Sequence, residues 1–359
     1  MLINVARHIY SVAMDAPEPS FRNTFNERYD PLIRRIVREL SIDARASTNK
    51  LASAAASYRR KVSQKLEEAE QKLGLRYTIE LNEQKLGLIN SHLILAKFES
   101  KPQLSSLVSL LSSSHVPQVA ATIKGNYDLI IYANAETSGE YVHWDKTTQM
   151  RLSEYGVLWE PSDVAHMQLG FVPLRNELIS TLQLQEEYKR MLMLLNENSR
   201  MSFSEMGKRL GVHFNTVAYR FNKLLNSGYI RRFTITMDKI PKTSTMAVAG
   251  KYSIKDGFEN DAANERKAIM ADDTLPLANR YMLANQLVGS YDFFFVGTFD
   301  SREIAVRHGA GYFKRSMGRH LVRSRYGEID KVILGRLPIR SIDTKSEYRT
   351  IKWTLEQHP

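Results

Sequence analysis

The residues best suited to chemistry form a polar stretch between positions 213 and 232. One face of an expected helix carries His213, Asn215, Thr216, Tyr219, Arg220 and Lys223. The opposite face carries Val217, Phe221 and Leu224, which is the spacing of an amphipathic helix. Amide, hydroxyl, imidazole and guanidinium groups arranged in this way can bond to base edges and phosphates. The pattern predicts a helix that lies in the major groove of duplex DNA, with Arg231 and Arg232 just beyond it.

A similar but more cationic set stands earlier in the chain. It consists of Arg59, Arg60, Lys61, Lys65 and Arg76, with Ser57 and Gln64 on the same expected helix. The formal net charge is +11 and the calculated pI is near 9.5, which favours a polyanionic partner. Basic residues outnumber acidic ones in both stretches, so we expect both to contact double-stranded DNA.

Helix signals place these residues in two helix-turn-helix modules. In the later module we expect a helix over 202–210 with a Ser202–Glu205 capping box, a turn at Gly211 and a helix over 215–225. A two-strand wing is predicted over 229–237. The earlier module is expected to have helices from Pro31, over 47–55 and over 57–73, then a strand over 75–81.

The turn of the earlier module lacks glycine. Ala54, Ala55 and Ala56 stand where the later module has Arg209, Leu210 and Gly211. A non-glycine residue must then adopt the left-handed conformation that such turns often need. We expect the first recognition helix to be altered in geometry, or to clamp phosphates rather than to read bases.

The chain is internally repeated. Gly289 follows Gly125 by 164 residues, each opening a Gly-x-Tyr-Asp turn, and Arg200-Met201-Ser202 follows Arg45-Ala46-Ser47 by 155 residues. Patterns repeated in the same order indicate a duplicated unit of about 160 residues.

Strand and helix patterns after each module predict two ferredoxin-like βαββαβ domains. We expect strands over 92–98, 119–123, 127–133 and 165–172, with helices over 103–111 and 141–155. The second copy repeats this order over 246–252, 262–271, 281–287, 291–299, 302–317 and 331–337. The predicted fold class is α+β. The expected domains are an N-terminal extension (1–28), winged helix-turn-helix domains (29–88 and 176–243), βαββαβ domains (89–175 and 244–340) and a polar tail (341–359).

The stretch from Arg200 to Thr234 resembles the winged helix of the Lrp/AsnC (feast/famine) transcription regulators, and the Gly-x-Tyr-Asp turns resemble that family's sensing domain. This resemblance implies a DNA-binding regulator that assembles into homo-oligomers through its βαββαβ domains. Because this chain has two of each domain, we expect a covalent pseudo-dimer, whose two sheets pair within one chain. Its two heads need not be alike, so the DNA site could be asymmetric.

The resemblance also implies a small, amino-acid-like effector near the Gly-x-Tyr-Asp turns. The candidate residues are Gly125, Tyr127, Asp128, Gly289, Tyr291 and Asp292. Turn chemistry alone accounts for glycine and aspartate at such positions, and we favour this structural explanation.

Two alternatives remain. Siroheme decarboxylases share the pairing of winged helix and βαββαβ domain, but the cationic side chains expected on their third strand are missing from Gln118–Ile123 and Tyr281–Gln286. A protein-binding scaffold is the other. The nine His are scattered without ligand spacing, so we expect no metal, no cofactor and no enzymatic activity.

The remaining features are less specific. A chain without cysteine, without an apolar run long enough to cross a membrane and without a recognisable signal peptide fits a cytoplasmic protein. The basic stretch over 304–327 is either a surface that touches DNA wrapped around an assembly or a solvated helix face.

Overall fold

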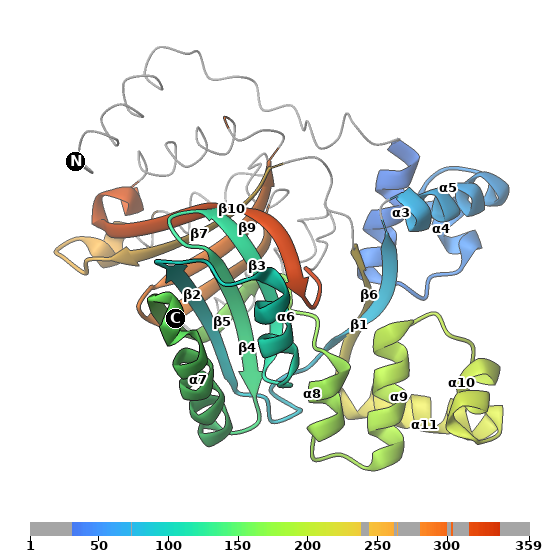
Figure 1. The fold of residues 1–359 in the computed structure, drawn as a ribbon. Coiled ribbons are helices and arrows are strands. Elements are labelled where there is room, and N and C mark those ends of the chain that lie inside the picture. Colours follow the sequence, from blue (N-terminus) through green and yellow to red (C-terminus); the bar gives the residue numbers. More distant parts are fainter. Residues whose placement is uncertain are drawn as a thin grey trace.

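The computed structural model describes residues 31–72, 74–237, 244–261, 281–299 and 316–337, together with residues 264 and 303. Two helical heads lie one above the other on one side of a β-barrel (Figure 1). A two-stranded ribbon, β1 and β6, runs between the heads. The predicted α+β class is confirmed.

The two heads are copies of one three-helix unit. The first contains α3 (Pro31–Ile42), α4 (Thr48–Ala54) and α5 (Arg59–Lys72). The second contains α9 (Glu186–Glu197), α10 (Phe203–Leu210) and α11 (Phe214–Ser227), and α8 (Asn176–Thr181) precedes it. Each helix of the second head begins 155 residues after its counterpart, so residues separated by 155 are structurally equivalent.

The strand that follows each head pairs with the strand of the other head. β1 (Leu75–Leu81) and β6 (Ile230–Met237) are antiparallel, with Thr78 opposite Thr234. The predicted two-strand wing over 229–237 is therefore wrong, because this segment is one strand and its hydrogen-bonding partner is β1. Each head obtains half of its ribbon from the other copy.

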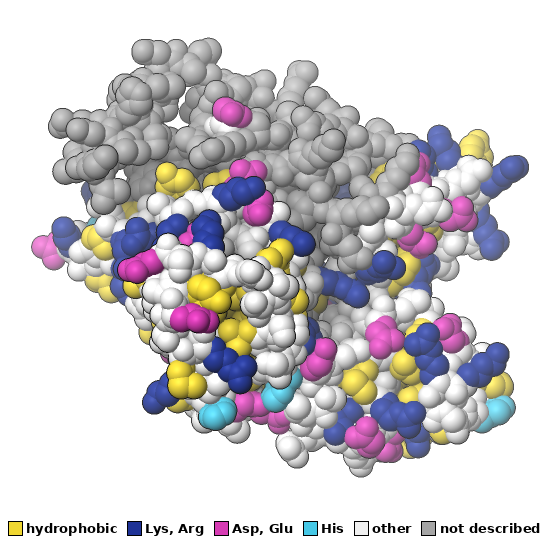
Figure 2. Space-filling model, viewed as in Figure 1, with side chains coloured by type: hydrophobic (Ala, Val, Ile, Leu, Met, Phe, Trp, Pro, Cys, Tyr) yellow, Lys and Arg dark blue, Asp and Glu magenta, His cyan; other side chains and the backbone are white. Residues whose placement is uncertain are grey.

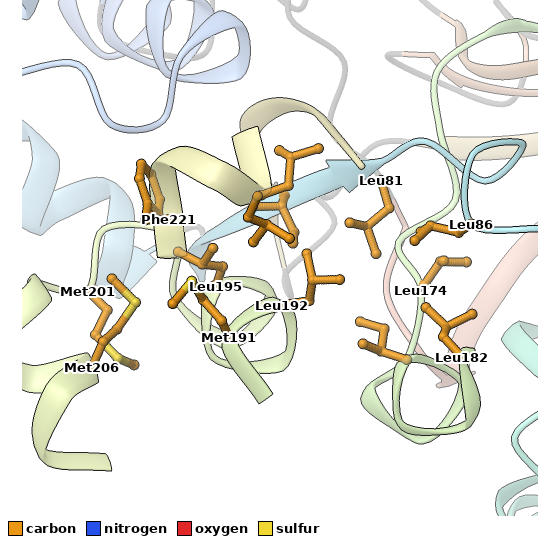
Figure 3. Close-up of a cluster of buried hydrophobic side chains, with 14 of the residues drawn as sticks. Leu81, Leu86, Leu174, Leu182, Met191, Leu192, Leu195, Met201, Met206 and Phe221 are labelled. Atoms are coloured by element: carbon orange, nitrogen blue, oxygen red, sulfur yellow. The ribbon is translucent and has the colours of Figure 1, made fainter. Parts of the chain in front are cut away.

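The ribbon also completes both hydrophobic cores. Ile79 and Leu81 of β1 are buried with Met191, Leu192 and Phe221 of the second head (Figure 3). Ile235 of β6 is fully buried in the core of the first head. Burial of an aliphatic side chain contributes about 1.5–3 kcal/mol, so neither head has a complete core without the strand of the other.

Polar contacts cross between the heads in both directions. The Thr78 hydroxyl donates to the Asn196 carbonyl at 3.0 Å, and the Thr234 hydroxyl donates to the Ser41 carbonyl at 2.9 Å. Ser41 and Asn196 are themselves equivalent under the 155-residue repeat. These bonds fix the heads in a pseudo-two-fold arrangement.

Two equivalent arginines extend this exchange. Arg45 donates to the carbonyl of Ser199 at 2.6 Å, and Arg200 donates to the carbonyl of Ala46 at 2.7 Å. The Arg45 guanidinium lies 5.0 Å from the ring centroid of Phe221, and burial lowers its pKa. Both residues contribute to the basic excess of the sequence, yet they join the two heads.

The barrel contains eight described strands in the order β10-β3-β4-β2-β5-β8-β9-β7, closed by pairing of β7 with β10. Its strands are β2 (Asn90–Phe98), β3 (Pro117–Gly125), β4 (Leu129–Ala135), β5 (Val157–Leu169), β7 (Ser244–Tyr252), β8 (Tyr281–Gly289), β9 (Phe293–Phe299) and β10 (Leu321–Leu334). Within each copy the fourth strand lies beside the first, then the third and the second, which is the ferredoxin-like order.

The last strand of each copy begins earlier than predicted. β5 begins at Val157 and β10 at Leu321, because the first half of each pairs with the first strand of its own copy, β2 and β7 respectively. The second half of each pairs with the second strand of the other copy, β8 and β3 respectively. The pairing between copies joins the two sheets within one chain and leaves no open edge in the barrel.

Helices α6 (Leu104–Ser112) and α7 (Ser138–Leu152) cover the outer face of the first sheet (Figure 1). Short 3₁₀ turns follow at Ser153–Tyr155 and Ser316–His320. The helices predicted over 262–271 and 302–317 lie largely outside the described residues, as do the N-terminal extension and the polar tail.

We expect Ile235→Ala to loosen the first head although residue 235 belongs to the second copy. Loss of this buried side chain lowers the free energy of unfolding by about 2–4 kcal/mol. Hydrogen exchange should accelerate in α3, α4 and α5. The matched variant Leu224→Ala, in the core of the second head, should accelerate exchange in α9, α10 and α11 instead. Equal effects of the two variants on both heads would contradict the strand exchange.

Candidate nucleic-acid interface

Helix α11 presents a polar and aromatic face to solvent. His213 caps its N-terminus, with Nδ1 accepting from the Asn215 amide at 3.4 Å. Val217, Phe221 and Leu224 are buried against the head, as their spacing predicts. Asn215 and Lys223 are exposed, and Tyr219 is 68% exposed. The outer face of α11 is therefore accessible to a partner.

The two cationic side chains of α11 already have interaction partners within the second head. Arg220 is half-buried, and its guanidinium lies 3.9 Å from the Glu187 carboxylate. The Lys223 ammonium lies 6.0 Å from the centroid of the Tyr188 ring, and its hydrogen bond to that tyrosine raises its pKa. Thr216 is half-buried beside them.

Helix α5 presents a cationic face in the equivalent place. Arg59, Arg60 and Lys61 form its first turn and are exposed. Lys65, one turn later, is half-buried and pairs with Glu68 at 2.7 Å. The positions that carry Phe214, Asn215 and Thr216 in α11 thus carry three positive charges in α5.

The predicted basic residues of the ribbon have different surroundings. Arg232 Nε lies 2.5 Å from the Glu80 carboxylate, and Arg231 lies 3.8 Å from the same group. Arg76 is exposed on β1. The Glu80 carboxylate therefore neutralises part of the positive charge that the sequence places beyond α11.

Sequence reasoning missed two exposed aromatic residues. Phe214 is 50% exposed at the first position of α11, and Tyr58, just before α5, is 82% exposed. Large apolar side chains at the start of both recognition helices interrupt the otherwise polar outer face. This interruption is visible in the sequence and could have identified the two residues.

Basic side chains lie on the surface of both heads. Figure 2 shows Lys and Arg side chains along the outer edges of both lobes, with acidic side chains among them in each lobe and a notch between the lobes. The lower lobe is the second head and the upper lobe is the first.

The turns before the recognition helices have the same backbone conformation. Ala56 has φ 48° and Gly211 has φ 70°, so the alanine adopts the left-handed conformation that glycine adopts in the other copy. The expected strain at Ala56 is thus present, while the helix-turn-helix geometry is retained.

The Gly-x-Tyr-Asp turns lie where the two sheets meet. The Tyr127 hydroxyl donates to the Ala247 carbonyl at 3.0 Å, and the Tyr291 hydroxyl donates to the Glu160 carboxylate at 2.5 Å. Both bonds cross from one copy to the other. Burial raises the pKa of both hydroxyls, that of Tyr291 to about 12.

The aspartates of these turns hold local partners. Asp128 accepts from the Phe98 amide at 3.1 Å and pairs with Lys97 and Lys101, and these contacts lower its pKa although burial opposes the shift. Asp292 likewise accepts from the Tyr252 amide at 2.7 Å and pairs with Lys251.

The glycines stand where another strand comes close. A Cβ atom at Gly125 would lie 2.4 Å from the Tyr326 carbonyl oxygen, and Gly289 has φ 128°. The turn residues thus have structural roles, while effector binding at them stays a prediction.

The loop between β1 and β2 meets the barrel at a half-buried carboxyl group, that of Glu83. Glu83 accepts from Asn134 of β4 at 2.9 Å and from Ser91 of β2 at 3.4 Å. Burial raises the pKa of Glu83 to about 7. The loop between β1 and β2 therefore connects the ribbon to the barrel through a group that titrates near neutrality.

The described part of the basic stretch 304–327 is largely ion-paired. His320 lies 2.6 Å from the Asp261 carboxylate, and Arg319 pairs with the same group. Arg323 pairs with Glu160 at 3.0 Å and lies over the Tyr291 ring. Residues 304–315 lie outside the described part. Among the described residues, no cluster of three or more His, Asp or Glu side chains could hold a metal ion.

The second head, which carries the exposed helix α11, is similar to a known domain type. Residues 189–225 match the family of AsnC-type helix-turn-helix domains. Residues 189–225 form an AsnC-type helix-turn-helix domain. An uncharacterized HTH-type transcriptional regulator of Pyrococcus abyssi is 44% identical over 52 residues, which is 14% of this chain and 33% of that protein. The chain thus spans about a third of the length of the curated relatives it matches. The resemblance to Lrp/AsnC regulators is confirmed, and the domain supports DNA binding.

A solved structure extends over nearly the whole chain. The siroheme decarboxylase NirDL has a TM-score of 0.53 at 13% identity, covering 91% of this chain and 99% of NirDL. NirDL in co-complex with an iron-uroporphyrin III analogue has a TM-score of 0.51, also at 13% identity, covering 90% of this chain and 98% of that one. This likeness shows the fold. It contradicts our expectation of a chain without enzymatic activity, because the tandem fold is also the fold of an enzyme.

No helix among the described residues is long and apolar enough to span a membrane.

The paired turns allow a test of strain. We expect Ala56→Gly to raise the free energy of unfolding by about 0.5–1 kcal/mol, since glycine adopts positive φ without steric cost. Gly211→Ala should lower it by about 1 kcal/mol, and that cost is conformational because a Cβ atom there meets nothing within 4 Å. Denaturant unfolding measures both. If both variants changed the free energy of unfolding in the same direction, the two turns would not be equivalent.

Proposed function

We propose that this chain is a DNA-binding transcription regulator of Lrp/AsnC type, built as a covalent pseudo-dimer. The observation that carries this proposal is the pair of exposed recognition helices, α5 and α11, on two heads joined by one ribbon. A symmetric regulator obtains two heads from two chains, whereas here one chain supplies both.

The surface chemistry supports duplex DNA as the partner. Arg59, Arg60 and Lys61 can neutralise phosphates, while Asn215 and Tyr219 can reach base edges. We propose the domain boundaries that the sequence predicts, with the ribbon between the heads and the barrel.

Assembly of further chains is part of the proposal. Because the described strands form a closed barrel, additional chains would associate through helices or loops rather than by adding strands to a sheet edge. An amino-acid-like effector would bind near the Gly-x-Tyr-Asp turns at 125–128 and 289–292.

DNA binding is tested by fluorescence anisotropy with labelled duplexes over a series of salt concentrations. We expect the affinity of the unmodified chain to fall steeply with salt. The triple variant Arg59→Ala, Arg60→Ala, Lys61→Ala should bind all sequences more weakly and reduce the logarithmic salt slope by about 2 to 3.

The matched variant Asn215→Ala, Tyr219→Ala should leave the salt slope nearly unchanged and should relax sequence preference. If the chain does not bind duplex DNA at low ionic strength, the proposed function as a regulator is wrong.

A second candidate function is an enzyme that acts on an anionic tetrapyrrole. Its support is the likeness to NirDL over almost the full chain, whereas the AsnC-type helix-turn-helix family description matches residues 189–225. The segments Gln118–Ile123 and Tyr281–Gln286 carry no Lys, Arg or His, but they lie on β3 and β8, the second strand of each copy. The third strands, β4 and β9, carry none either, which weighs against this candidate.

Titration of the purified chain with iron uroporphyrin discriminates between the two functions. A tetrapyrrole enzyme should shift the Soret band with saturable stoichiometry. A spectrum identical to that of the free compound at all ratios would remove this candidate and leave the regulator.

A further inference from the structure

The two recognition helices offer different chemistry at equivalent positions. Under the 155-residue repeat, Arg59 corresponds to Phe214, Arg60 to Asn215, Lys61 to Thr216 and Gln64 to Tyr219. The first, second and sixth residues of each helix, which are Arg59, Arg60 and Gln64 in α5 and Phe214, Asn215 and Tyr219 in α11, are exposed. The N-terminal part of a recognition helix is the part that reaches base edges, so the difference lies where DNA would be read.

Helix α11 presents groups that suit adenine and thymine. Asparagine pairs with the N6 and N7 groups of adenine, and apolar or aromatic side chains contact the thymine methyl. Asn215 is flanked by Phe214, 50% exposed, and Tyr219, 68% exposed. Guanine is most often read by arginine, and the one arginine of α11, Arg220, is half-buried and directed at Glu187.

Helix α5 presents groups that suit phosphates. Its first turn carries three adjacent cations, and the same positions of α11 carry none. Among the described residues, no ion pair involves Arg59, Arg60 or Lys61. A dense positive charge binds DNA with little regard to sequence and with strong dependence on salt.

The two heads cannot move independently of each other when the chain binds DNA. The β1–β6 ribbon, the Arg45–Ser199 and Arg200–Ala46 hydrogen bonds and the exchanged core residues hold both heads in one body. Each chain therefore carries one head of each kind at a fixed separation.

We propose that the chain recognises an asymmetric operator in a single orientation. Helix α11 reads an adenine–thymine half-site, and α5 anchors the opposite half to the phosphate backbone. This inference rests on the proposed DNA-binding function.

The experiment uses the absence of cysteine from the chain. Gln71→Cys and Asn226→Cys stand at equivalent exposed positions near the ends of α5 and α11, away from the residues proposed to bind bases or phosphates. Each full-length variant is coupled to an iron–EDTA cleavage reagent and bound to a duplex selected by the unmodified chain from random DNA.

We expect the selected duplex to have an A·T-rich block on one side only. The reagent at residue 226 should cut beside that block, and the reagent at residue 71 should cut only the opposite half. Asn215→Ala should reduce preference for the block about 5- to 100-fold. The Arg59, Arg60, Lys61 triple alanine variant should select the same sequence with lower affinity.

Three results would overturn the proposal. One is a palindromic selected site. Another is cutting of both halves by each reagent in equal measure, which means binding in both orientations. The third is a change in selected bases on substitution of the α5 cations. In these three cases DNA binding itself stands, whereas absence of any complex at low salt would remove the regulator together with this inference.

Discussion

The pairing of β1 with β6 is the constraint on which the rest of the architecture depends. It takes one strand from each copy, and each strand places aliphatic side chains in the core of the other head. Since a two-stranded ribbon alone is marginally stable in water, its stability comes from the helices packed on it. The helices in turn need the ribbon, because without it Ile79, Leu81 and Ile235 would leave voids. Neither copy is a complete unit without the other.

Because the two copies belong to one chain, their sequences can differ at equivalent positions. In a dimer of identical chains every substitution appears on both sides of the axis. Here the copies can differ, and they do: Ala56 replaces Gly211, a cationic first turn replaces a mixed aromatic and amide one, and Tyr127 and Tyr291 bond to different partners. The contacts that join the copies use equivalent donors, Arg45 to the Ser199 carbonyl and Arg200 to the Ala46 carbonyl, although the two acceptors are not equivalent positions. The interface is similar in both directions while the outer surfaces differ.

Local signals in the sequence were sufficient for most of the described helices and strands. The Ser202–Glu205 cap, the left-handed turn at Gly211 and the apolar spacing of Val217, Phe221 and Leu224 act within a few residues, so they could be recognised without the fold. The strand partners could not. The sequence over 229–237 indicates β-structure, but nothing local shows that its partner lies more than 150 residues away.

The same distinction between local and long-range contacts explains why only part of the candidate site could be predicted. Exposure of Asn215, Tyr219 and Arg60 follows from helical spacing. The ion pairs of Arg231 and Arg232 with Glu80, and the burial of Arg45 between aromatic rings, depend on contacts between the copies. Net charge counts every cation alike, and only the structure separates those that join the heads from those that face a partner. The likeness to an enzyme of the same tandem fold was likewise beyond what strand residues alone could decide.

The central claim, that one ribbon holds two heads as a single body, is tested most directly by a distance measurement. Spin labels on α4 and α10, at the exposed Ser53→Cys and its equivalent Lys208→Cys, can be introduced specifically because the chain has no cysteine. Double electron–electron resonance should give one narrow distance distribution that stays the same when duplex DNA is added. A broad distribution in the free chain, with heads that move independently, would contradict the account.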